Sequence, residues 1–91
     1  MIKTIIASKL RDKEVIGING KKIGNLFDIS INETDGKILG IIITPKNQEI
    51  ESFFQTDRDK KIIVPYSAIN TFSEFIVIDE RRIPRKAKLN Q

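Results

Sequence analysis

A chain of 91 residues has room for one domain, because single-core domains usually run from about 50 to 250 residues. The sequence contains no cysteine and no histidine, which excludes disulfides, thiol nucleophiles, zinc-finger chemistry and the commonest general base. The formal net charge of +4 lies in residues 80–91, where five basic side chains outnumber Glu80, so the body of the chain is electrically balanced.

The first predicted elements are strands joined by tight turns. Nineteen isoleucines against four leucines favour strands, since β-branched side chains fit a pleated sheet and lose rotamer freedom in a helix. Asn19-Gly20 is typical of a two-residue type I′ turn and would join residues 14–18 to a strand that begins near Lys22. Asp35-Gly36 marks the next turn, and the strand over residues 37–44 ends at Pro45, which cannot donate to a ladder.

The second half of the chain continues this pattern. Residues 46–59 are mostly polar and predict a long loop that holds one helical turn. A strand over residues 60–64 precedes Pro65, which would begin a short helical turn. Residues 70–72 and 75–79 predict a last hairpin. Short strands separated by turns, without an apolar period of 3.6 residues, indicate a small barrel or sandwich.

The second strand contains a change of phase. Ile23, Phe27 and Ile29 share one parity, whereas Leu26 lies on the other. The extra residue of a β-bulge produces such a change, so we predict a bend near Phe27-Asp28. With Leu26 and Ile29 both in the core, Phe27 would point outward. We expect the Asp28 carboxylate to accept backbone N–H groups that the bulge leaves unpaired.

The third strand is apolar on both faces. One face carries Leu39, Ile41 and Ile43, and the other carries Ile38 and Ile42. This pattern indicates either a central strand covered by loops or an apolar face that needs a partner. Together with an outward Phe27, it leads us to predict a homodimer.

Four segments in order resemble the PRC-barrel domain family. The first covers residues 13–31 and contains Gly20-Lys21-Lys22-Ile23-Gly24 before the apolar-Asp-apolar strand around Asp28. The others cover residues 36–41, 63–69 and 75–79. No single segment is specific for the family, but the order and spacing of all four over roughly residues 8–79 are specific for it. Asp12 departs from the family pattern, which usually has a glycine before the lysine, and this puts only the local turn in question.

The resemblance implies an all-β fold: a small six-stranded PRC-type β-barrel with a short helical turn over residues 1–79, and a flexible basic C-terminal tail over residues 80–91. It also implies protein binding without catalytic machinery. The family includes half of a bacterial ribosome-maturation factor, a photosynthetic reaction-centre subunit and free-standing archaeal proteins, some of them adaptors in cell division. On these segments the chain resembles the free-standing archaeal type. Without a transmembrane helix we do not expect the reaction-centre subunit, and without its partner domain we do not expect the ribosome-maturation factor.

The sequence predicts no enzyme, no cofactor and no metal site. Asp57 and Asp59 flank Arg58 and indicate a solvated loop. Ser67 and Tyr66 have no histidine to activate them. The longest apolar run covers six residues, 38–43, against the ~20 needed to span a bilayer, so we expect a soluble cytoplasmic protein.

The candidate interaction residues are three phenylalanines and five basic side chains: Phe27, Phe53, Phe54, Arg81, Arg82, Arg85, Lys86 and Lys88. Adjacent rings in an extended loop point to opposite sides, so we expect the loop either to bury at least one of them or to present them to a partner. The tail has no interleaved aromatic residues, so nucleic-acid binding through it would be salt-sensitive and blind to sequence.

Two functions follow from these features. The leading hypothesis is a non-enzymatic protein-interaction adaptor that forms a homodimer and acts, as some similar archaeal proteins do, in cell division. The alternative is an RNA- or ribosome-associated accessory protein that uses Arg81 to Lys88. A solvated tail also predicts that removing residues 80–91 changes stability by less than about 1 kcal/mol.

Overall fold

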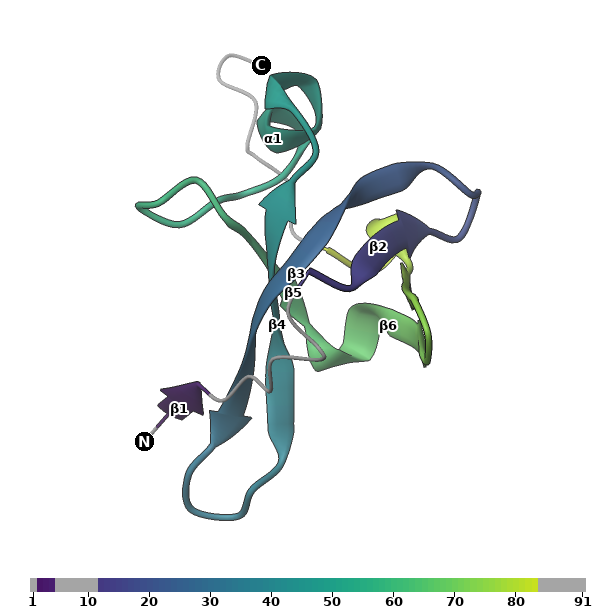
Figure 1. Cartoon of the computed structure of the whole chain (residues 1–91). Coiled ribbons are helices and arrows are strands. Elements are labelled where there is room, and N and C mark those ends of the chain that lie inside the picture. The colour runs from purple at the N-terminus through teal and green to yellow at the C-terminus, as the bar shows by residue number, and fades with distance from the viewer. Residues whose placement is uncertain (1, 5–11, 84–91) are drawn as a thin grey trace.

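The computed structural model describes residues 2–4 and 12–83 as one mixed β-sheet with one short α-helix (Figure 1). Six strands follow the order β5-β4-β3-β2-β7-β6. Their bounds are β2 Glu14–Gly17, β3 Lys22–Asn32, β4 Ile38–Pro45, β5 Ile62–Pro65, β6 Ile69–Phe72 and β7 Ile76–Ile78. A further strand, β1 (Ile2–Thr4), pairs with the C-terminal part of β3. The predicted fold class is confirmed.

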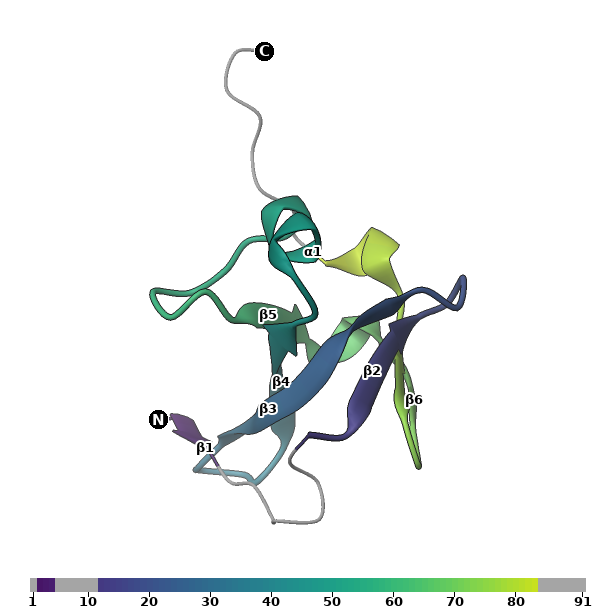
Figure 2. The same cartoon turned by 45° about the horizontal axis from the view of Figure 1, so that its top comes forward.

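The long strand β3 connects the two halves of the sheet. Its first part pairs with β2, and β4 lies along its other edge, both antiparallel. The pairing of β2 with β7 is parallel, which makes the sheet mixed. Figure 2 shows β4 and β5 on one side of β3 and β2 and β6 on the other, so the sheet curls around an interior.

Two glycines allow this curl. A Cβ on Gly24 would collide with the carbonyl oxygen of Thr44, and a Cβ on Gly40 would collide with the carbonyl oxygen of Val64. Each of these glycines is paired with the proline that ends the neighbouring strand, Pro45 or Pro65. The backbones therefore approach more closely at these points than any side chain would permit.

The predicted bulge in β3 is confirmed. Leu26 pairs with Ile43 and Asp28 with Ile42, which leaves Phe27 as the extra residue. Leu26 is buried, whereas Phe27 is 38% exposed.

A second irregularity lies further along the same pair of strands. Ser30 pairs with Gly40 and Ile31 with Ile38, so Leu39 is the extra residue on β4. The expected placement of Leu39 beside Ile41 and Ile43 is therefore wrong, because the bulge shifts its phase, and Leu39 is 40% exposed.

The first hairpin turn differs from the predicted type. The Gly17 N–H donates to the Lys21 carbonyl at 2.8 Å, which encloses a three-residue loop. Gly20 has a φ of 90°, but Asn19 is not among the residues with positive φ. A type I′ turn needs positive φ at both central positions, so that prediction is wrong. Instead, the Asn19 side chain accepts the Lys21 N–H at 3.1 Å and stabilises the longer loop.

The predicted helical turns are present. Helix α1 (Gln48–Phe53) lies within the polar loop, and the side chain of Asn47 caps it by accepting the Ile50 N–H at 2.9 Å. The 3₁₀ turn η1 (Tyr66–Ala68) follows Pro65, which lies at the N-cap in extended conformation rather than inside the turn. A second 3₁₀ turn, η2 (Glu80–Arg82), follows β7. No helix in the described ranges is long and apolar enough to cross a membrane.

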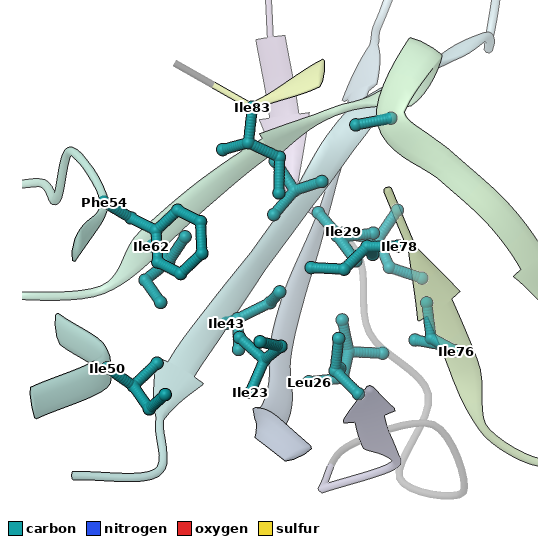
Figure 3. Packing of buried hydrophobic residues seen from close by; sticks show 14 residues of the cluster. Ile23, Leu26, Ile29, Ile43, Ile50, Phe54, Ile62, Ile76, Ile78 and Ile83 are labelled. Atoms are coloured by element: carbon teal, nitrogen blue, oxygen red, sulfur yellow. The ribbon is translucent and has the colours of Figure 1, made fainter. Parts of the chain in front are cut away.

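One core lies inside the curl (Figure 3). Its buried apolar residues are Val15, Ile23, Leu26, Ile29, Ile41, Ile43, Ile50, Phe54, Ile62, Val64, Ala68, Ile76, Ile78 and Ile83. Ile83 is only 4% exposed and points into this cluster in Figure 3. The packed body therefore continues beyond the expected boundary at residue 79, because η2 turns the chain back so that Ile83 reaches the core.

We expect Gly40→Ala to lower the free energy of unfolding by about 1–3 kcal/mol, because the added methyl group forces β4 and β5 apart. Denaturant unfolding at fixed protein concentration measures this loss. Ser30→Ala, on the strand position paired with Gly40, adds no volume and should change stability by less than about 0.5 kcal/mol. A Gly40→Ala variant as stable as the original chain would contradict the close approach.

Truncation after Asp79 is expected to lower the free energy of unfolding by about 2–5 kcal/mol, since it removes a buried isoleucine side chain. This replaces the small effect expected for a solvated tail. Ile83→Ala in the full chain should account for most of the loss in the same measurement. Equal stability of all three proteins would show that Ile83 adds nothing to the core.

Candidate functional site

Four apolar side chains on β3, β4 and β5 form what we call the outer patch: Phe27, Leu39, Ile42 and Ile63. Ile63 is 52% exposed, and Ile42, its direct neighbour on β4, is half-buried. Phe27 and Leu39 are the extra residues of the two bulges. Bulges change the direction of a side chain, and here both add a large apolar group to the exposed surface.

A groove of about 710 Å³ runs along this surface. Its lining residues are Ser30, Leu39, Gly40, Ile41, Ile42, Gln55, Thr56, Ile63, Val64 and Pro65. The volume lies within the range of ligand-binding clefts, roughly 300–1,000 Å³. The described residues that line the groove include no charged side chain, so its chemistry suits an apolar occupant with a few hydrogen-bonding groups.

Two charged residues border the outer patch. The Lys61 ammonium lies 4.9 Å from the centre of the Phe27 ring, a cation–π contact. Asp57 helps to place this lysine, because its carboxylate accepts the backbone N–H groups of Asp59 and Lys61. The Asp28 carboxylate, next to Phe27 in β3, accepts the Ile29 N–H at 2.8 Å, as expected for a residue beside the bulge.

The two adjacent phenylalanines of the polar segment are separated by the end of α1. Phe54 is 4% exposed and belongs to the core, which confirms that the segment buries at least one ring. Phe54 is therefore not available at the surface. Phe53 is 46% exposed, and the Lys21 ammonium lies 5.5 Å from the centre of its ring. The two rings diverge because Phe53 ends the helix while Phe54 is already extended.

A further pair of exposed aromatic side chains lies on the hairpin of β6 and β7. Phe72 is 40% exposed and Phe75 is 45% exposed. The Lys13 ammonium donates to the carbonyl oxygens of Ser73 and Glu74 between them, and this fixes the tip. This hairpin was predicted from the sequence, but its phenylalanines were not identified as surface residues. The sequence signal for their exposure was their position on either side of the Ser73-Glu74 turn.

The described basic residues of the predicted tail contact a buried carboxylate. Arg81 donates to Asp79 through its backbone N–H at 3.0 Å, its Nε at 2.9 Å and its Nη2 at 3.0 Å. The Nε of Arg82 lies 3.7 Å from the same carboxylate. The hydrogen bonds from the Arg81 side chain lower the pKa of Asp79 and raise that of Arg81. Arg85, Lys86 and Lys88 lie outside the described residues.

The acidic residues do not form a metal site in the part of the chain that the structure describes. No group of three or more histidine, cysteine, aspartate or glutamate side chains comes together there. Asp57 and Asp59 lie in the polar loop expected from the sequence, where the Asp57 carboxylate also accepts the backbone N–H groups of Asp59 and Lys61.

Comparisons with known proteins agree with this fold. The family model described as PRC-barrel domain matches residues 3–83. The "Probable sporulation protein YlmC" of Bacillus subtilis is 33% identical over 75 residues, which covers 81% of this chain and 89% of that protein. The "Uncharacterized protein MJ1118" of Methanocaldococcus jannaschii is 25% identical over 79 residues, 87% of this chain and 85% of that protein. The chain is thus similar to a bacterial and an archaeal protein over most of their lengths.

We expect Asp79→Asn to lower the free energy of unfolding at neutral pH, since it removes the charge that Arg81 and Arg82 contact. The pKa of Asp79 is lowered from its ordinary value of 3.8, so its contribution is present above that value. The contribution is lost as the pH falls through the lower pKa of the folded state. Unfolding curves at neutral and strongly acidic pH should therefore show a difference between the two proteins that shrinks in acid.

An NMR titration of the native chain provides the control for this prediction. The carboxyl resonance of Asp79 should titrate below 3.8, its ordinary pKa. A titration midpoint at or above that value would contradict the proposed role of the Arg81 hydrogen bonds.

Proposed function

Because the chain belongs to the PRC-barrel domain family, we propose that it is a non-enzymatic adaptor that binds other proteins in the cytoplasm. The observation that carries this proposal is the outer patch together with its groove. Contiguous exposed apolar surface with a polar border is typical of protein interaction sites. The members of the outer patch are held by strand pairing and bulges, so they need little reorganisation to bind.

The chemistry of the groove supports a protein partner over a charged metabolite. Ser30, Gln55 and Thr56 are its polar lining residues, and the others are aliphatic or glycine. A phosphate or carboxylate would be bound best by arginine or by clustered N–H groups. An apolar segment of another protein matches this lining, with Gln55 and Thr56 available for hydrogen bonds to its backbone.

An adaptor must contact two partners, and the chain offers two separate apolar surfaces. The outer patch lies toward the β5 end of the strand order, whereas Phe72 and Phe75 lie toward the β6 end. We define the second surface, Phe72 and Phe75 with the turn between them, as the hairpin tip. We propose that a partner bound at one surface leaves the other accessible, which is the property that an adaptor requires.

The proposed biological process rests on similarity alone. The name of the Bacillus subtilis relative refers to sporulation, and the second relative comes from an archaeon. A role in archaeal cell division is the specific form of the proposal that the family resemblance suggests. The outer patch and the hairpin tip would suit protein binding in either sporulation or cell division.

The RNA-associated alternative receives less support from the described residues. Arg81 and Arg82 both contact Asp79, so part of their charge is already balanced. The alternative therefore depends on Arg85, Lys86 and Lys88, and it predicts binding that weakens steeply with salt.

Capture from a lysate with the tagged full chain tests the proposal. We expect at least one of Ile63→Glu and Phe75→Glu to reduce capture of a specific protein about tenfold or more, because a charge in an apolar contact must be desolvated. Ile18→Glu is the matched control, since Ile18 is 43% exposed in the loop after β2, outside both surfaces. It should capture as the original chain does.

A different pattern of capture would favour the RNA-associated alternative. Capture that neither Ile63→Glu nor Phe75→Glu reduces, but that nuclease treatment or removal of residues 84–91 abolishes, would overturn the adaptor proposal in favour of RNA association.

A further inference from the structure

We infer that the small cavity between the loop after β2, helix α1 and the turn η2 binds a free α-amino acid with a branched aliphatic side chain. This cavity shares no lining residue with the groove of the outer patch, and none with the hairpin tip. The inference therefore goes beyond the proposed function, which requires no small ligand.

Three segments that are far apart in the sequence form the rim of the cavity. Asn19 and Lys21 come from the loop after β2, Phe53 from the last position of α1 and Glu80 from η2. Figure 2 shows these three segments at the same end of the molecule. Lys21 and Phe53 are exposed, so a ligand can enter from solvent.

The floor of the cavity is apolar and well packed. It consists of Ile23, Ile50 and Phe54, each at most 4% exposed. The volume of about 200 Å³ is below the roughly 300–1,000 Å³ of clefts for drug-sized ligands. At ~30 Å³ for each water molecule in the liquid, it corresponds to about seven waters. A molecule of leucine's size therefore fits, with its aliphatic side chain on the floor.

The two charged groups at the rim match a zwitterion. Lys21 is positive and Glu80 is negative, and no ion pair joins them within the described part of the chain. The Lys21 ammonium lies 5.5 Å from the centre of the Phe53 ring. Neither this ammonium nor the half-buried Glu80 carboxylate makes a hydrogen bond with another described residue. A ligand that carries both a carboxylate and an ammonium supplies a partner for each.

Local contacts position the groups that would bind the two ends of the ligand. The Asn19 side-chain oxygen accepts the Lys21 N–H at 3.1 Å, so its amide N–H₂ group remains as a donor next to Lys21. The Glu80 carboxylate lies against Gly17, where a Cβ would collide with it. We therefore assign the ligand carboxylate to Lys21 and Asn19, and the ligand ammonium to Glu80.

Ligands with a single charge fit this rim less well. A phosphate or a simple carboxylic acid would meet the like charge of Glu80, and a simple amine would meet that of Lys21. A peptide terminus also offers only one of the two charges. A free amino acid offers both, and it leaves neither Lys21 nor Glu80 unpaired.

An NMR titration of the isotope-labelled full chain with leucine at neutral pH tests the inference. We expect saturable shifts centred on the amide signals of residues 17–21, 50–54 and 80–82, with a dissociation constant of about 1 mM or lower. N-acetyl-leucine lacks the ammonium and leucinamide lacks the carboxylate. Each should bind about fivefold or more weakly than leucine, because one hydrogen-bonded charge is lost.

Two variants test the assignment of the charges. Glu80→Gln should weaken leucine binding about fivefold or more without weakening that of N-acetyl-leucine, which has no ammonium for Glu80 to contact. Lys21→Gln should weaken leucine binding to a similar degree without weakening that of leucinamide. Lys37→Gln is the matched control, since Lys37 is exposed in the turn between β3 and β4, at the opposite end of the molecule from α1 (Figure 1). It should bind leucine as the original chain does.

Several results would overturn the inference. One is the absence of saturable shifts at tens of millimolar leucine. Another is equal binding of leucine, N-acetyl-leucine and leucinamide, and a third is leucine binding that both Glu80→Gln and Lys21→Gln leave unchanged. Protein capture through the outer patch or the hairpin tip is measured with other variants, so the adaptor proposal can fail while amino-acid binding stands, and the reverse.

Discussion

The close approach of neighbouring backbones at Gly24 and Gly40 is the constraint on which the rest of the structure depends. At both positions a side chain would collide with a carbonyl oxygen of the adjacent strand, and at both the partner strand ends in a proline. Without a Cβ, the strands can cross steeply enough for a short sheet to curl around a core. A flat sheet of the same strands would leave the isoleucines of its inner face in water.

The outer patch is a consequence of the same curl. A strongly bent sheet tends to take up extra residues as bulges, which increase local twist and change the direction of a side chain. In this chain the extra residues of β3 and β4 are a phenylalanine and a leucine, and both add apolar surface to the outside. Closing the core and exposing an apolar surface are thus two results of one geometry, and neither requires a separate element.

This geometry explains which features the sequence could predict. The bulge at Phe27 was predictable, because the polar residues Asn25 and Asp28 flank the pair Leu26-Phe27 and make the change of phase visible. The bulge at Leu39 was not, because residues 38–43 are apolar or glycine throughout, and a slip of register leaves no trace in such a run. Similarly, adjacent Phe53 and Phe54 left open whether the segment buries a ring or presents both to a partner, and which ring is buried depends on where α1 ends.

Asp79 attaches the first residues of the basic segment after β7 to the folded body. Its carboxylate accepts the Arg81 N–H and so caps η2, and this turn brings Ile83 to the core. The same carboxylate contacts the side chains of Arg81 and Arg82. It partly balances these two positive charges, which reduces their attraction for a polyanion. Among the described residues, the charges of Arg81 and Arg82 are therefore partly balanced, which composition alone does not reveal. The described residues also expose large apolar side chains on β3, β4 and β5 and on the hairpin of β6 and β7.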